Sequence, residues 1–229
     1  IARLKKVFKP HGARVAAHDP SDGGQDAKGY ACRHASIITR VMQKDSGEID
    51  EGCDWAINQA IQDKADVFVW DCDGMGAGLK RQISTGFKDT RTKYHAFRGS
   101  LSGIGQDNAD KIYMPVEDDN RRSAKTYAET FKNNRSQYYC ELAARFFNTY
   151  RCVVREEYVD PQDMISIDTD GVESIDSLRS EICRIPEKMN TGATGLRQLM
   201  TKQEMLKMGI ASPNMSDSVM MLWANPQAQ

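Results

Sequence analysis

The chain has 229 residues, and its 31 lysine and arginine residues against 32 aspartate and glutamate residues give a formal net charge of −1. This length suits one large domain or two small ones. The near-zero charge argues against a protein that coats nucleic acid by bulk electrostatics, although it leaves room for a local basic groove. No apolar run approaches the roughly 18 residues that a membrane span needs, so no membrane partner is expected.

The six cysteines are too sparse for a disulfide scaffold, and no two of them form a CxxC pair. We therefore expect free thiols and a reducing, cytosolic compartment.

The first part of the chain predicts an antiparallel meander. Residues 1–14 carry basic side chains and no acid, and a short strand over 14–19 leads into a turn over 20–26 that is dense in turn-forming residues. β-Branched residues predict a second strand over 30–41. A third strand is expected to begin near residues 40–42.

Alternating helices and strands follow the meander. An amphipathic helix is predicted over 50–64, and the continuous apolar run over 65–71 is typical of a strand buried on both faces. A glycine-rich turn at 74–78 leads into a helix over 79–85, and a further strand is expected over 94–97.

The third part reads as a loop over 98–122 and a long helix over 123–150. Eight acids and no lysine or arginine lie between Glu156 and Leu178. The role of the acidic 156–176 stretch stays open between disorder and a regulatory segment.

Near the C-terminus we expect a short helix over 175–182 and an edge strand over 184–186, because proline is excluded from central strands. Thr201 begins a capping-box pattern, and a last helix should begin near residues 214–216. The whole order predicts a single α/β domain with a mixed central sheet flanked by helices.

Three acids stand where a site could form. Asp19 and Asp71 each end an apolar strand, and Asp217 begins the last helix. Strand-end acids converge at the carboxyl edge of a sheet, and a helix N-terminus favours a third carboxylate there. Such a cluster needs a compensating cation, and hard oxygen ligands suit Mg²⁺ or Mn²⁺. The plainer alternatives are a helix-start residue for Asp217 and a turn residue for Asp19.

Secondary candidates lie close to these acids in the sequence, namely Asp22, Asp26 and Asp73. We expect Asp26 to hold the turn and Asp73 to point away from Asp71. The glycine turn at 74–78 lacks the Gly-Lys-Ser/Thr of a P-loop, so it is more simply a tight strand-to-helix turn. A basic group could contact a DNA backbone or form a solvated helix face: Arg121, Arg122, Lys125, Lys132 and Arg135.

The segments at 18–26, 69–76 and 209–218 resemble, in this order, the motifs of the nuclease domain of the large terminase subunit of tailed bacteriophages. The resemblance covers about residues 13–224 and is closest to short-tailed phages that package by the headful mechanism. It implies an RNase H-like domain over 15–224, with 1–14 as the junction to a missing N-terminal ATPase domain and 225–229 as a tail.

The family further implies a metal-dependent endonuclease that cuts concatemeric double-stranded viral DNA when packaging begins and ends. Its metal-binding acids fall on Asp19, Asp71 and Asp217, which would hold two ions, and a basic residue before the last motif corresponds to Lys202. The implied partners are DNA, the upstream ATPase domain, the portal protein and the small terminase subunit. The implied location is the host cytoplasm, transiently on the procapsid.

Two other functions stay open on the sequence. One is a non-catalytic DNA-binding or docking module with an RNase H-like fold, which would bind no divalent ion. The other is a nucleotide-binding α/β domain that uses the turn at 74–78, against which the missing Lys-Ser/Thr counts.

Overall fold

The computed structural model describes residues 11–23, 26–114, 125–188 and 195–224. A mixed sheet in the order β5-β4-β1-β2-β3-β6 forms its centre. β1 pairs antiparallel with β2 and parallel with β4, and β2 pairs antiparallel with β3. The strands are β1 (Arg14–Asp19), β2 (Lys28–His34), β3 (Ile37–Lys44), β4 (Val67–Asp71), β5 (Lys93–Phe97) and β6 (Ser166–Ile167).

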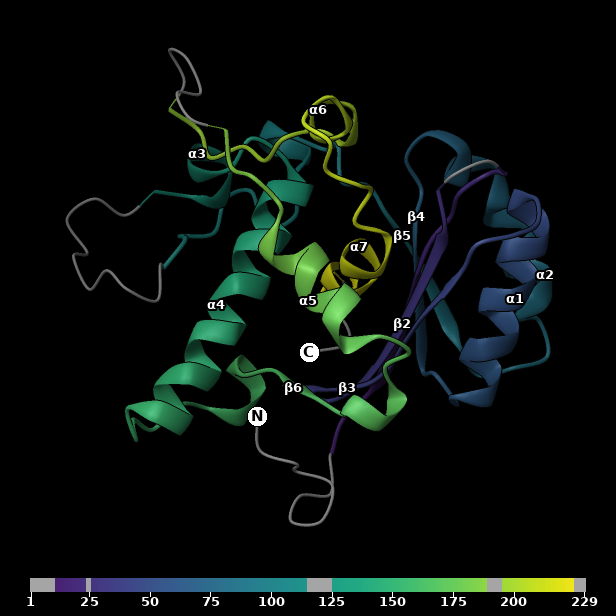
Figure 1. Ribbon diagram of the computed structural model, residues 1–229, viewed down its shortest axis with the longest axis horizontal. Coiled ribbons are helices and arrows are strands. Elements are labelled where there is room, and N and C mark those ends of the chain that lie inside the picture. The colour runs from purple at the N-terminus through teal and green to yellow at the C-terminus, as the bar shows by residue number, and fades with distance from the viewer. Residues whose placement is uncertain (1–10, 24–25, 115–124, 189–194, 225–229) are drawn as a thin grey trace.

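Helices cover both faces of the sheet, with α1 and α2 on one side and α4, α5 and α7 on the other (Figure 1). The helices are α1 (Ile49–Gln62), α2 (Lys80–Gly86), α3 (Tyr127–Thr130), α4 (Asn134–Val154), α5 (Ile175–Cys183), α6 (Lys202–Lys207) and α7 (Asn214–Met221). This three-layer arrangement confirms the predicted α/β class with a mixed, helix-flanked sheet.

The neighbouring parallel strands β1 and β4 contribute to two separate cores, because successive side chains of a strand point to opposite faces. In β1, Val15 and Ala17 join the core beneath α4, α5 and α7, whereas Ala16 packs in the core beneath α1 and α2. In β4, Val69 and Phe68 divide in the same way. Burial on both faces explains why these strands read as continuous apolar runs.

Helix α7 lies unusually close to the sheet, and Gly29 is the residue that permits it. Gly29 pairs with Asp19 across β1 and β2. A Cβ atom at Gly29 would lie 2.2 Å from the carbonyl oxygen of Asn214 and 2.4 Å from the Ser218 hydroxyl. The missing side chain therefore lets the first turn of α7 settle beside the end of β1.

Two predicted elements are each divided in the structure. The strand predicted over 30–41 is two strands, β2 and β3, joined at Ala35 and Ser36, with Ala35 at a φ of 52°. The helix predicted over 123–150 is the short α3 and the long α4, because the chain is extended at Phe131 and the Asn133 side chain caps α4 through the Ser136 amide.

One further expectation near the C-terminus was wrong, and one open alternative is decided. Residues 184–186 form no strand, and the sheet edge is β6, which pairs with Ile37 and Ile38. The acidic segment is ordered over 156–178 and contains β6, two short 3₁₀ helices and the start of α5. The alternative that this segment is disordered is therefore excluded.

Other predictions are confirmed. β1, α1, β4, α2, β5 and α7 lie where the sequence placed them within a few residues, and Thr201 forms a capping box at the start of α6. All six cysteines are free. Across the described residues, no helix is both long and apolar enough to cross a membrane. The junction expected over 1–14 is described only from residue 11, and the tail over 225–229 lies outside the described residues.

Candidate active site

The acids of β1 and β4 meet because of the register between these strands. His18 pairs with Trp70, so Asp19 and Asp71 follow side by side at the same edge of the sheet. Both continue the alternation that points Ala17 and Val69 toward α7. The two carboxylates therefore share an edge and a face, as the sequence predicted.

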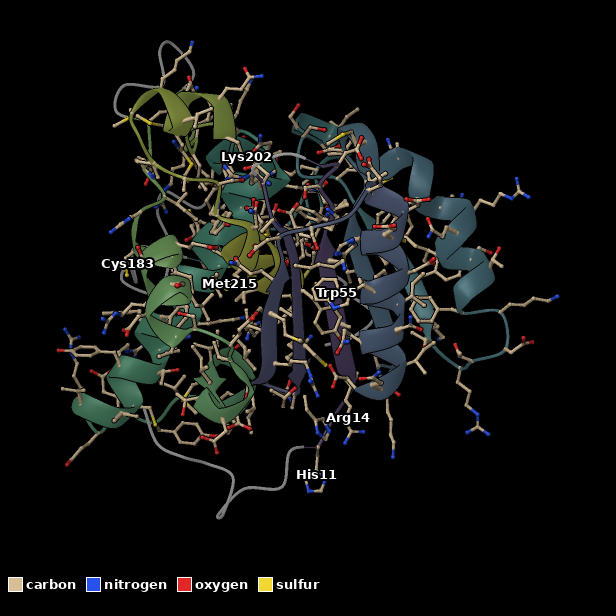
Figure 2. The ribbon with its side chains drawn as sticks, turned by 45° about the vertical axis from the view of Figure 1, so that its right-hand side comes forward. His11, Arg14, Trp55, Cys183, Lys202 and Met215 are labelled. Carbon is tan, nitrogen blue, oxygen red and sulfur yellow. The ribbon has the colours of Figure 1, made fainter. Side chains whose placement is uncertain are left out.

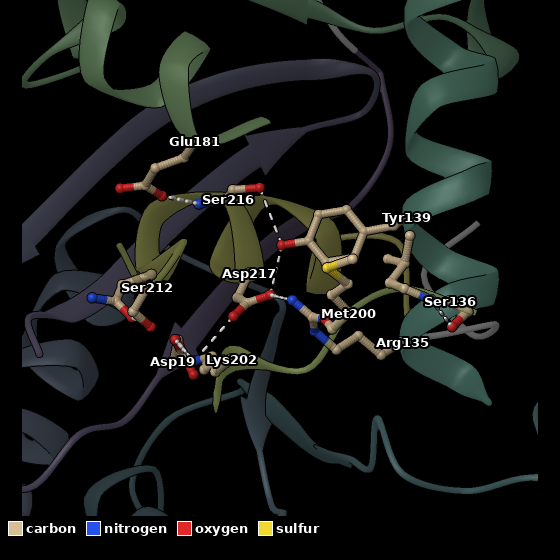
Figure 3. A network of polar contacts seen from close by, with 12 residues as sticks. Asp19, Arg135, Ser136, Tyr139, Glu181, Met200, Lys202, Ser212, Ser216 and Asp217 are labelled. Carbon is tan, nitrogen blue, oxygen red and sulfur yellow. Dashed lines mark hydrogen bonds and ion pairs between the residues drawn. The ribbon is translucent and has the colours of Figure 1, made fainter. Parts of the chain in front are cut away.

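Asp217 joins this pair from α7, and Lys202 from α6 links it to Asp19 (Figure 3). The Lys202 ammonium lies 2.9 Å from Asp19 Oδ2 and 3.0 Å from Asp217 Oδ2. Both carboxylates are buried, whereas the Lys202 side chain is 41% exposed. Asp19 and Asp217 thus meet at one lysine that solvent can reach.

Two residues of α4 hold the other oxygen of Asp217. The Tyr139 hydroxyl donates a hydrogen bond of 2.5 Å to Asp217 Oδ1 and lies 3.1 Å from the Ser216 hydroxyl. The Arg135 guanidinium lies 3.5 Å from the same oxygen and donates a hydrogen bond to the Met200 carbonyl. Asp217 is therefore held by the Tyr139 hydroxyl and by the positive charges of Arg135 and Lys202, which come from two other helices.

The first turn of α7 is fixed by a carboxylate from α5. Its N-cap, Pro213, makes no capping hydrogen bond through its side chain. Instead, Glu181 accepts a hydrogen bond of 2.9 Å from the Ser216 amide, as Figure 3 shows, and interacts with the Met215 amide. A negative charge at this position also suits the helix dipole. Glu181 thereby positions the turn that carries Asp217.

The acids differ in their affinity for protons. Burial, together with the negative charge of the neighbouring Asp19, raises the pKa of Asp71 to about 7. Burial likewise raises the pKa of Asp19 to about 6, although Lys202 opposes this shift. Burial alone would raise the pKa of Asp217 as well. The positive charges of Lys202 and Arg135 outweigh this effect and hold the pKa of Asp217 below its usual value. Asp217 is therefore the fixed negative charge of the site at neutral pH.

The donor set has the chemistry that a hard divalent cation prefers, which is several carboxylate oxygens with incomplete charge compensation. In the described ranges, however, no three aspartate, glutamate, histidine or cysteine side chains are grouped closely enough to hold a metal ion. The place between Asp19 and Asp217 is taken by the Lys202 ammonium. The negative charge of Asp19 and Asp217 that would attract a cation is here balanced by the Lys202 ammonium.

A cavity of about 240 Å³ opens beside these acids. Asp71, Lys202 and Asp217 line it, together with Asp73 and Ser100. Asp73 accepts hydrogen bonds from the amide and the hydroxyl of Ser100, at 2.7 and 2.9 Å. Asp73 therefore faces the site and does not point away from it, contrary to our expectation, and it anchors the loop after β5.

The other secondary candidates lie elsewhere. Asp22 is exposed, and its carboxylate accepts a hydrogen bond from the Ile49 amide at the start of α1. Asp26 is also exposed, and its carbonyl accepts a hydrogen bond from Ser21, which agrees with its predicted role in the turn. The glycine turn is a 3₁₀ helix, in which a Cβ atom at Gly76 would lie 1.8 Å from the Asp71 carbonyl oxygen. Close packing explains this glycine.

The predicted basic group is divided between surface and site. Lys125 and Lys132 are exposed, whereas Arg135 is turned inward against Asp217. Arg121 and Arg122 lie outside the described residues. Contact of this group with DNA stays a prediction.

Sequence reasoning missed Tyr139 and Glu181. Tyr139 lies among apolar residues of α4, and its ring is buried. Its hydroxyl is the polar part, and a buried tyrosine hydroxyl usually finds a partner. Glu181 was one more acid near a long acidic stretch, and nothing in its spacing pointed to α7.

Solved structures similar to this chain are nuclease domains of the large terminase subunit gp2 of bacterial virus Sf6. One is a lysine-to-alanine variant with manganese and β-thujaplicinol, at 42% identity and a TM-score of 0.86, covering 97% of this chain and 93% of its own. The domain without that substitution matches at 42% identity and a TM-score of 0.86, covering 97% and 92%. A lysine-to-alanine variant with calcium matches at 41% identity and a TM-score of 0.84, covering 97% of this chain and 92% of its own.

No protein-family model matches the chain, and no curated protein sequence does. The mixed six-stranded sheet with its flanking helices is that of an RNase H-like domain. At this identity and coverage, the chain belongs to the family of nuclease domains of phage large terminase subunits.

Proposed function

We propose that this domain is a metal-dependent endonuclease that cuts concatemeric double-stranded viral DNA when genome packaging begins and ends. The observation that carries the proposal is the convergence of Asp19, Asp71 and Asp217 at one sheet edge, in a fold whose relatives are nuclease domains. The need of these buried acids for positive charge supports a cationic cofactor.

The proposed ligands are the carboxylates of Asp19, Asp71 and Asp217, and the proposed ions are two Mg²⁺ or Mn²⁺. When bound, such a pair supplies an activated water and stabilises the leaving oxygen of a phosphodiester. Similar domains contain manganese or calcium, which supports a divalent ion. Lys202 compensates Asp19 and Asp217 in the structure described here, so its ammonium must move aside when an ion takes that place.

The protein partners follow from the same proposal. We propose double-stranded DNA as the substrate and an ATPase domain preceding this domain in the same chain, with residues 1–14 as the junction and 225–229 as a tail. The portal protein and the small terminase subunit are the further partners that a packaging role requires. Such a domain would act in the host cytoplasm, while it is docked on the procapsid.

The test is Mn²⁺-dependent nicking of supercoiled plasmid by the wild type and by Asp71→Asn. We expect the variant to lose nicking while its far-UV circular dichroism and melting temperature show a folded protein. The matched control is Asp66→Asn, since Asp66 precedes β4 at the opposite end and contacts the Arg14 amide. Retained cleavage by Asp71→Asn would rule out the metal assignment.

Calorimetric titration with Mn²⁺ separates this proposal from a non-catalytic docking module. The nuclease proposal expects heat of binding in the wild type and its loss in Asp71→Asn. Absence of binding by the folded wild type would favour the docking module.

A further inference from the structure

The loop that follows β5 ends in a fully exposed aliphatic side chain. The loop leaves the sheet after Phe97, lines the cavity at Gly99 and Ser100 and forms a 3₁₀ turn at Gly103–Gly105. Ile104 at this turn is 101% exposed, and Leu101 before it is 36% exposed. Ile104 belongs to neither hydrophobic core, so packing within the domain does not explain an aliphatic side chain at this position.

Hydrogen bonds hold this loop on both sides of Ile104, so the exposure of Ile104 does not result from a loop without fixed contacts. Ser100 is bound to Asp73 through its amide and its hydroxyl. The Leu101 carbonyl accepts a hydrogen bond of 2.9 Å from the Asn134 amide at the start of α4. Beyond the turn, the buried Gln106 side chain donates to Gln137 at 3.0 Å.

The loop is also close to the acids. Ser100 lines the same cavity as Asp71 and Lys202. Ile104 is four positions after Ser100, which limits their Cα atoms to at most roughly 14 Å apart. The grooves of B-form DNA are about 12 and about 6 Å wide. The Ile104 turn is therefore within about one major-groove width of Ser100, which lines the cavity.

We propose that Ile104, backed by Leu101, inserts into a groove of the duplex next to the phosphate that is cut. This inference rests on the proposed function and adds the side chain that grips the substrate. Aliphatic wedges enter the minor groove and separate base steps, whereas single strands are held by aromatic faces, which Ile104 lacks. Exposed Arg98 at the base of the loop supplies a cation for the backbone.

Opening a base step near the cut would present the backbone of one strand to the acids. A kink turns the backbone of one strand outward, and this loop is tied to Asp73, so the distortion lies within a few residues of the acids. Because an aliphatic wedge reads deformability and not base edges, the contact adds grip without imposing a strict sequence.

The test compares Ile104→Ala and Ile104→Glu with the wild type on two Mn²⁺-dependent substrates. One is supercoiled plasmid, and the other is bis(p-nitrophenyl) phosphate, a diester too small to reach the loop. We expect Ile104→Glu to reduce plasmid nicking about tenfold, mainly through KM, with hydrolysis of the small diester unchanged. The control is Val154→Glu, since Val154 is 60% exposed at the far end of α4, a helix of 21 residues, about 30 Å long.

A second measurement does not depend on cleavage. In the Asp71→Asn background, binding to a duplex with 2-aminopurine reports unstacking as a rise in fluorescence. We expect the rise with Ile104 and its loss in the Ile104→Ala double variant. Equal nicking by Ile104→Glu and wild type, or an unchanged fluorescence rise in the double variant, would overturn the wedge. If the folded wild type cleaves neither substrate, the proposed function fails, and the fluorescence alone decides on the wedge.

Discussion

The Tyr139 hydroxyl donates a 2.5 Å hydrogen bond to Asp217 Oδ1 across 78 residues of sequence. This bond joins the long helix α4 to the first turn of α7 and fixes one oxygen of the carboxylate, while Lys202 holds the other. A carboxylate held at both oxygens has little freedom to rotate. The geometry of the acid cluster therefore depends on residues that would not themselves touch an ion.

Tyr139→Phe keeps the ring and removes only this donor. We expect Mn²⁺ affinity to fall about tenfold, as is usual when a partner of a metal ligand is lost, measured by calorimetric titration. Stability should fall by about 1 to 2 kcal/mol.

The control for this variant is Tyr138→Phe, since the Tyr138 hydroxyl donates to Asp107 and not to the acid cluster. We expect a similar loss of stability and unchanged Mn²⁺ affinity. Equal Mn²⁺ affinities for the two variants would argue against a positioning role for Tyr139.

The raised pKa values of Asp19 and Asp71 predict a pH dependence with a definite sign. Their folded pKa values of about 6 and about 7 lie above the ordinary value of 3.8. Between about pH 4 and about pH 7 the folded protein therefore holds protons that the unfolded chain has released, so its stability without metal falls as the pH rises.

Divalent ions compete with these protons. We therefore expect the gain in Tm on adding Mg²⁺ to be small near about pH 5 and complete above about pH 7. Thermal unfolding with and without Mg²⁺ measures this. An equal gain at both ends of the range would contradict the assignment of Asp19 and Asp71 as ligands.

Lys202→Met removes the ammonium and keeps most of the length of the side chain. Because this ammonium competes for Asp19 and Asp217, we expect Mn²⁺ to bind several-fold more tightly, measured by titration. Lys207→Met, at an exposed position in α6, should leave the affinity unchanged. Weaker binding by Lys202→Met would show that the lysine assists the ion and does not compete with it.

Gly29→Ala tests the close approach of α7 to the sheet. The added methyl would collide with the Asn214 carbonyl, so we expect a loss of about 2 kcal/mol in denaturant unfolding. Gly78→Ala is the matched control, since a Cβ atom there meets nothing within 4 Å. Unchanged stability of Gly29→Ala would mean that α7 can shift outward at little cost.

The sequence was sufficient to predict the strands β1 and β4 and the acids at their ends. An apolar run ending in an acid is a local pattern, and parallel pairing of β1 with β4 turns two such patterns into neighbours. Asp217 could be predicted from a local pattern too, because it lies in the first turn of a helix that is rich in apolar residues.

The remaining features depend on contacts between distant segments. Ala35 adopts a positive φ although nothing in its type favours one, because the pairing of β2 with β3 requires a turn there. Glu181 caps a helix that begins more than thirty residues later. Such partners are set by how α4, α5 and α7 pack, and periodicity within one segment carries no information about them.

The direction of β1 has a practical consequence. This strand enters the sheet beside Asp66 and ends at Asp19, so Lys202 lies at the opposite end of the molecule from His11 and Arg14, as Figure 2 shows. A label or a surface tether attached at His11 would leave the end that carries Asp19 and Lys202 facing solution. The domain is thus suited to immobilisation in single-molecule assays, with DNA offered to the free end.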